Sequence, residues 1–150
     1  MIGVVIHVTD HCSCEWILER VIYNARELGA THILAVDHTQ YHSLDYYDHS
    51  DEATTFLKYT SLEDIEAAFP GATWVYLEAQ QTILDCGGTP VAINDFDHPE
   101  EDVIYCTGPD FGPSIATEGR AGASWVYIGC DTLWGQCAAE LALFDRLTYG

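Results

Sequence analysis

Two short segments near the carboxyl-terminal end of this 150-residue chain carry residue types that could bind a small nucleotide-like ligand. Residues 107–112 follow an apolar run and combine Gly108, Asp110 and Gly112. Glycine lets main-chain amides approach a ligand closely, because it has no side chain in the way. Residues 129–132 follow a second apolar run and place Thr132 ahead of an alanine-rich stretch. The two segments therefore predict a ligand pocket built from the turns that follow two strands.

A cluster of histidines and cysteines near the amino terminus offers a different chemistry. It consists of His7, His11, Cys12 and Cys14, and a Cys-x-Cys pair can supply thiolates to zinc. No second pair of ligands follows at the spacing typical of a zinc finger. We therefore do not predict a metal centre at this cluster.

A second cluster lies in the polar segment 37–52 and consists of His38, His42, Asp45, Asp48, His49 and Asp51. Its first two histidines are four residues apart, which would suit a divalent ion if the segment were helical. Histidines beside acids in a loop usually form solvated surface pairs. We interpret the segment as a solvated loop, and a metal-dependent hydrolase built on it is an alternative hypothesis.

The elements that must position these residues alternate along the chain between apolar runs and amphipathic segments. Strands are expected at residues 2–8, 32–36, 74–77, 91–93, 103–106 and 125–128, with a short extended piece at 54–59. Helices are expected at residues 14–29, 61–69, 80–85 and 133–147. This alternation predicts one α/β domain over residues 1–150, with a mostly parallel sheet that helices cover on both faces.

The charge of the chain is unusual for a protein that binds nucleic acid. Twenty-four acidic residues against five basic residues give a formal net charge of −19 and a pI near 4.2. Affinity for nucleic acid comes mainly from neutralised phosphates and usually requires a basic stripe, which this sequence lacks. We expect the acids to form a solvated surface, as in proteins adapted to high salt, or to face a basic partner.

The remaining composition favours a soluble cytoplasmic protein. A hydrophobic content of 48% can fill one sizeable core, and no run reaches the roughly 20 apolar residues that span a bilayer. The first residues resemble a strand and lack the basic start and cleavage site of a signal peptide. The six scattered cysteines are expected to be reduced.

Four passages of the chain resemble the SpoU-like branch of the SPOUT class of methyltransferases. Residues 25–30, Ala-Arg-Glu-Leu-Gly-Ala, are similar to the end of the family's first helix. Residues 107–112 are similar to its glycine–acid loop, residues 132–134 to its Ser-Leu-Asn turn, and residues 143–147 to the end of its last helix. The resemblance implies a trefoil knot, S-adenosylmethionine as the cofactor, methylation of tRNA or rRNA at a ribose 2′-hydroxyl, and a homodimer.

The resemblance also assigns roles to single residues. The residues that it places around S-adenosylmethionine are Thr107, Gly108, Asp110, Gly112, Ile128, Gly129, Thr132, Leu133 and Trp134. The family's catalytic arginine on the first helix is replaced by Tyr23, while Arg20 lies one turn earlier on roughly the same face. Arg20 and Tyr23 are therefore the candidate catalytic residues. Since Ile17 also replaces an asparagine and Trp134 an amide side chain, the alternative is an inactive SPOUT-like homodimer that binds a basic partner.

Overall fold

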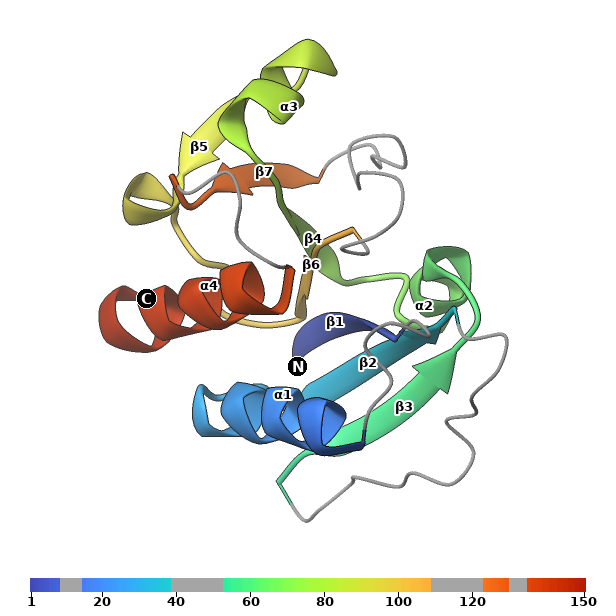
Figure 1. Ribbon diagram of the computed structural model, residues 1–150. Helices are drawn as coiled ribbons and strands as arrows, with labels where there is room; N and C mark the ends of the chain where they lie inside the picture. Colours follow the sequence, from blue (N-terminus) through green and yellow to red (C-terminus); the bar gives the residue numbers. More distant parts are fainter. Residues whose placement is uncertain (9–14, 39–52, 109–122, 130–134) are drawn as a thin grey trace.

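The computed structural model describes residues 1–8, 15–38, 53–108, 123–129 and 135–150 (Figure 1). Within these residues the chain forms one seven-stranded sheet in the order β3-β2-β1-β6-β4-β7-β5, and every pair of neighbouring strands is parallel. The strands are β1 (Ile2–Val8), β2 (His32–Asp37), β3 (Thr55–Tyr59), β4 (Thr73–Leu77), β5 (Pro90–Ala92), β6 (Val103–Cys106) and β7 (Ser124–Tyr127). The helices are α1 (Glu15–Glu27), α2 (Leu62–Ala68), α3 (Gln80–Asp85) and α4 (Gly135–Tyr149), with the 3₁₀ turn η1 (Ile93–Asp95).

The central strands are buried on both faces, as the apolar runs predicted. All four residues of β6 are buried, and so are five of the seven residues of β1. Helices α1 and α4 lie side by side over one face, where Ile22, Ala142 and Leu143 join the core (Figure 1). Helix α2 packs Leu62 and Ile65 against the other face. The α/β architecture with a covered parallel sheet is therefore confirmed.

Local signals set several element boundaries. Ser61 caps α2, since its hydroxyl accepts a hydrogen bond from the main-chain N–H of Asp64 at 3.2 Å. Helix α1 ends at Glu27, and Gly29 takes a φ of +94°, a left-handed conformation that glycine adopts without steric strain. The helix stop expected at Gly29 is thus confirmed.

Several strand boundaries differ from the prediction by one residue, among them the starts of β4, β5 and β7. Ile93 was expected to end a strand, but it begins η1, because its carbonyl accepts a hydrogen bond from Phe96 N–H and turns the chain. Asp37 was expected to open the polar loop, but it is the last residue of β2, because it pairs with Val8 in the parallel register. The described part of the chain also contains seven strands where about six were expected, since β3 pairs fully along β2 as an edge strand.

A buried hydrogen-bonded triad ties the end of α4 to the sheet. His98 Nδ1 lies 2.6 Å from the Tyr105 hydroxyl on β6, and His98 Nε2 lies 2.7 Å from Asp145 Oδ2 on α4. Burial raises the pKa of Tyr105 to about 12, so its hydroxyl stays protonated and can donate to His98. The remaining imidazole N–H then donates to the Asp145 carboxylate. The triad fixes the position of α4, and with it the start of that helix at Gly135.

The strand order places the carboxyl ends of β1, β6, β4 and β7 next to one another. The chain first builds β1, β2 and β3 outward to one edge, and then builds the other half of the sheet from β4 onward (Figure 1). Strand β6 enters between β1 and β4 and so lies where the two halves meet. In open α/β sheets, ligands bind outside the carboxyl ends of the strands at such a change of direction. No helix among the described residues is long and apolar enough to cross a membrane.

Candidate active site at the carboxyl ends of the central strands

The two segments that the sequence singled out begin at neighbouring positions of the sheet. Thr107 and Gly108 follow β6, and Ile128 and Gly129 follow β7, while β4 lies between these strands. Cys106 pairs with Tyr76 of β4, and Val126 pairs with Leu77 of the same strand, so the strand ends are level with one another. The described halves of the two predicted loops therefore leave the same edge of the sheet side by side.

Close main-chain packing brings the start of α4 onto the end of β6. A Cβ atom at Gly135 would lie 2.6 Å from Thr107 Oγ1 and 3.3 Å from the carbonyl oxygen of Gly108. Gly129, which precedes this helix, has a φ of +104°. Both positions require glycine, one for space and one for its conformation. Sequence reasoning named Gly129 but missed Gly135, whose signal was its place directly before an alanine-rich helix.

A second strand end adds a carboxylate that the sequence reasoning also missed. Glu78 follows β4, is half-buried, and accepts a hydrogen bond at Oε1 from the N–H of Ala79 at 2.9 Å. Its own N–H donates to the carbonyl of Val126 on β7. Glu78 thus lies between the ends of β6 and β7. Its signal in the sequence was the same as that of Thr107, a polar residue directly after a buried strand.

The other predicted ligand-binding residues lie outside the described part of the chain. They are Asp110, Gly112, Thr132, Leu133 and Trp134. Among the described ones, Thr107 is buried, Gly108 and Ile128 are half-buried and Gly129 is exposed. Main-chain groups follow the strand ends on either side of β4, and glycine occurs where a Cβ atom would intrude. Such groups can hydrogen-bond the polar edges of a nucleotide-like ligand. The described residues therefore fit such a ligand.

The two candidate catalytic residues lie elsewhere on the surface. Arg20 and Tyr23 project from α1, both exposed, and Tyr23 is 55% accessible. The neighbouring Asn24 donates a hydrogen bond from Nδ2 to Glu140 Oε1 of α4 at 3.1 Å. No contact among the described residues joins Arg20 or Tyr23 to Thr107 or Gly108. Their catalytic roles stay predictions.

A pair of histidines lies beside Thr107. His7 lies at the end of β1, and its Nε2 is 2.5 Å from the carbonyl oxygen of Thr107 on one side. Its Nδ1 is 2.8 Å from Nε2 of His38, which directly follows β2. The two rings are nearly parallel, with an angle of 21° between their planes and 5.1 Å between their centroids. The sequence had grouped each histidine with its chain neighbours, and the structure brings the two together across adjacent strands.

The surroundings of His7 keep its imidazole neutral. Burial is the main cause that lowers the pKa of His7 to about 4; the hydrogen bond to Thr107 opposes this shift, and the nearby His38 adds to it. The other members of the two sequence clusters that contain His7 and His38, such as Cys12 and His42, lie outside the described residues. Within the described ranges, no group of three or more His, Cys, Asp or Glu side chains could hold a metal ion.

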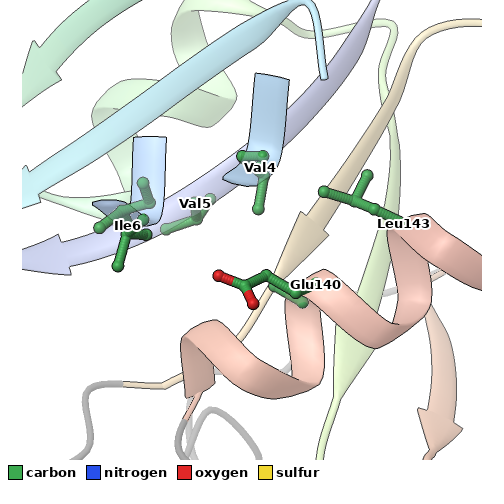
Figure 2. A pocket seen from close by; sticks show the side chains of 8 residues that line it. Val4, Val5, Ile6, Glu140 and Leu143 are labelled. Atoms are coloured by element: carbon green, nitrogen blue, oxygen red, sulfur yellow. The ribbon is translucent and has the colours of Figure 1, made fainter. Parts of the chain in front are cut away.

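A small pocket between α1, β1 and α4 is not the ligand site. Figure 2 shows Glu140 beside Val4, Val5, Ile6 and Leu143. Its inner space of about 10 Å³ is close to what one water molecule needs. Such a space is far smaller than the several hundred Å³ that sites for small molecules typically have. The carboxyl ends of β4, β6 and β7 therefore remain the candidate active site.

Comparison with known proteins identifies solved structures with a similar fold. No protein-family model matches the chain, and no curated protein sequence matches it. Its structure is similar to an rRNA methyltransferase from Sinorhizobium meliloti, solved with AdoMet bound (TM-score 0.62, 16% identity) and in a second structure (TM-score 0.64, 18% identity). In both cases 99% of this chain is covered, and it spans only 56% and 57% of the other protein's length. A proposed RNA methyltransferase from Bacillus anthracis is also similar, with a TM-score of 0.64, 15% identity and coverage of 98% of this chain and 94% of the other.

These similarities define the class of fold. The chain has a SPOUT-like RNA methyltransferase fold, as the sequence resemblance implied. The trefoil knot is a separate matter, since residues 109–122 and 130–134, which would form it, lie outside the described residues. The knot stays a prediction.

Proposed function

We propose that the protein is an S-adenosylmethionine-dependent RNA methyltransferase that acts on a ribose 2′-hydroxyl of tRNA or rRNA. The proposal rests on one observation. The strands β4, β6 and β7 end at the same level of the sheet, and Gly135 packs on Thr107 at this edge. It occurs in a fold shared with an rRNA methyltransferase that binds AdoMet. This chain spans little more than half the length of that protein. The RNA substrate of this chain is therefore also part of the proposal.

The residues at the ends of β6 and β7 have separate tasks in this reaction. When bound, S-adenosylmethionine supplies an electrophilic methyl group, so the protein has to orient the hydroxyl and help remove its proton. Main-chain groups at Thr107, Gly108, Ile128 and Gly129 would hold the cofactor. The resemblance adds Asp110, Gly112, Thr132, Leu133 and Trp134 to the same role. It places Arg20 or Tyr23 near the reacting hydroxyl.

We also propose a homodimer that packs α1 and α4 of one protomer against those of its partner. Exposed apolar side chains support this interface, namely Tyr23, Leu141, Phe144, Leu147 and Tyr149. Tyr149 is 80% accessible and Leu147 is 63% accessible, which is a high exposure for two large apolar side chains in the last turn of one helix. A dimer would cover them and place Arg20 and Tyr23 at a subunit boundary.

The net charge of −19 supports one alternative, a SPOUT-like dimer without activity that binds a basic protein. The two functions differ in their ligands. The alternative predicts no binding of S-adenosylmethionine and strong, salt-sensitive binding of a lysine-rich polypeptide.

The proposed function is tested by methyl transfer to RNA. Purified tRNA and rRNA are incubated with the protein and isotope-labelled S-adenosylmethionine, and the RNA is digested for mass spectrometry of its nucleosides. We expect label in one or more 2′-O-methyl nucleosides. Label on a base would show that the methylated atom is not the ribose 2′-oxygen. Absence of label from both RNAs would contradict the proposed function.

A further inference from the structure

The pair of His7 and His38 has no role in the function proposed so far, yet it lies beside the candidate site. His7 is the last residue but one of β1, the strand next to β6, and it contacts the carbonyl of Thr107, one of the expected cofactor-binding residues. His38 extends the pair outward and is exposed to solvent. A half-buried imidazole that is hydrogen-bonded to an exposed one beside a candidate ligand site is an arrangement suited to proton transfer.

The hydrogen bonds fix the direction in which this pair can move a proton. The carbonyl oxygen of Thr107 can only accept, so Nε2 of His7 must carry a hydrogen. Nδ1 of the neutral His7 is then an acceptor, and Nε2 of His38 must donate to it. These assignments leave Nδ1 of His38 with a lone pair and no hydrogen. Nδ1 of His38, the outermost nitrogen of the hydrogen-bonded pair, is therefore the nitrogen that can accept a proton.

The electrostatics of the pair favour proton uptake at His38 over His7. Burial keeps His7 neutral, as its pKa of about 4 indicates. The described groups that face His7 are the Thr107 carbonyl from β6 and the His38 ring after β2. A proton on Nδ1 of His7 would break the hydrogen bond from His38, whereas a proton on Nδ1 of His38 leaves both hydrogen bonds intact. His7 is thus built to hold the ring of His38, and His38 to take the proton.

We propose that Nδ1 of His38 accepts the hydroxyl proton of the RNA during methyl transfer, with His7 as the positioning residue. The inference rests on the proposed function. The hydroxyl oxygen uses a lone pair to bond the methyl carbon, and the carbon–sulfur bond breaks with its electron pair left on sulfur. The O–H electron pair stays on oxygen while the proton moves to His38. One positive charge leaves the sulfonium, and one appears on the imidazole, so the step balances.

This assignment supplies a proton acceptor for a chain that lacks the arginine expected on its first helix. Tyr23 occupies that position and is exposed on α1. The oxygen of a neutral phenol is a much weaker base than the unprotonated nitrogen of an imidazole. The histidine pair therefore suits the task better than either residue that the sequence had suggested.

The tautomers can be measured on the protein without cofactor or RNA. In a protein labelled with ¹⁵N at histidine, long-range proton–nitrogen spectra distinguish which ring nitrogen carries the hydrogen. We expect both His7 and His38 to carry it on Nε2 at about pH 7.5. A hydrogen on Nδ1 of neutral His7 would overturn the proposal.

The catalytic part is tested with His38→Gln, His7→Gln and the control His32→Gln. His32 begins β2 and so lies at the opposite end of the strand that leads to His38. Binding of S-adenosylmethionine is measured by calorimetry, and single-turnover transfer to the tRNA and rRNA pool is measured as a function of pH. We expect unchanged cofactor binding in all three variants. Transfer should fall about 10²-fold in His38→Gln and stay at the wild-type level in His32→Gln.

The pH profile separates a positioning role from a structural one. The wild-type rate should fall at acidic pH, and this decline should vanish in His38→Gln, because glutamine has no nitrogen that takes up a proton. In His7→Gln the decline of the rate should occur at a different pH, because glutamine replaces the imidazole that holds the ring of His38. Wild-type transfer by His38→Gln with normal cofactor binding would overturn this inference and leave the proposed function intact. Absence of cofactor binding or of transfer in the wild-type protein would overturn both.

A further outcome would also decide against His38 as the proton acceptor. If His7→Gln and His38→Gln both lose S-adenosylmethionine, the pair holds the Thr107 strand end for the cofactor and is not the proton acceptor. Circular dichroism of each variant establishes that such a loss is local to the site.

Discussion

Gly135 at the start of α4 lies so close to Thr107 at the end of β6 that a methyl group between them would be 2.6 Å from the threonine hydroxyl oxygen. The two residues are 28 positions apart in the sequence, yet their contact joins the two segments expected to enclose the cofactor. Because the neighbouring atoms include the carbonyl of Gly108, main chain as well as side chain has to shift if this glycine is replaced.

Gly135→Ala should therefore displace the Thr107–Gly108 strand end and weaken binding of S-adenosylmethionine by about tenfold, or roughly 1.4 kcal/mol. Gly71→Ala is the matched control, since a Cβ there would meet nothing within 4 Å. Calorimetric titration of both variants measures the effect. Equal affinity in Gly135→Ala and Gly71→Ala would show that the cofactor does not use this contact.

Asp145→Ala should destabilise the fold by about 1–3 kcal/mol, because it leaves the buried Nε2 of His98 without its acceptor. Urea denaturation at neutral pH measures the loss. Asp97→Ala removes a nearby carboxylate that is exposed and should change the free energy of unfolding by less than about 0.5 kcal/mol. If both variants unfold at the same urea concentration, the triad does not anchor α4.

The buried His7 should make stability depend on pH. Its pKa is about 4 in the folded protein and about 6.5 when unfolded, so between these values the unfolded state binds more protons. The part of the free energy of unfolding that is linked to His7 is fully present above about pH 6.5. It is lost as the pH falls toward 4, and the total loss is on the order of 3 kcal/mol.

His7→Gln isolates this contribution from that of the many carboxylates. Urea unfolding of both proteins is measured at about pH 7.5 and pH 5, and the difference between them should shrink at the lower pH. A difference that is the same at both pH values would contradict a neutral, buried His7.

Phe144→Glu should convert the proposed dimer into a monomer, because it places a charge on the exposed apolar face of α4. The side chain is 52% accessible in the single chain. Leu84→Glu is the control, since Leu84 is 49% accessible but belongs to α3. Light scattering coupled to gel filtration gives the masses. A wild-type monomer, or a dimer that survives in Phe144→Glu, would rule out this interface.

The sequence predicted the elements well because each depends on local pattern. The buried runs of β1 and β6 and the stop at Gly29 follow from hydrophobicity and from the conformations that glycine permits. Boundaries failed by one residue at Asp37 and Ile93, where pairing with Val8 and a hydrogen bond from Phe96 decided the end of the strand.

The candidate site was only partly accessible to such reasoning. Thr107 and Gly108 could be found because they directly follow a buried strand. The meeting of His7 with His38 could not, because it depends on which strands are neighbours in the sheet. Chain proximity suggested His11 and His42 as their partners, whereas the parallel register of β1 and β2 brings the two strand ends together. The role of Gly135 likewise depends on how α4 returns to β6.

The most direct test of the central claim is a calorimetric titration of the protein with S-adenosylmethionine at neutral pH. We predict saturable binding of one molecule per chain, accompanied by a rise in melting temperature that grows with ligand concentration. Absence of both heat and thermal stabilisation at about 1 mM ligand would contradict the account, since a Kd weaker than this corresponds to less than about 4 kcal/mol of binding free energy.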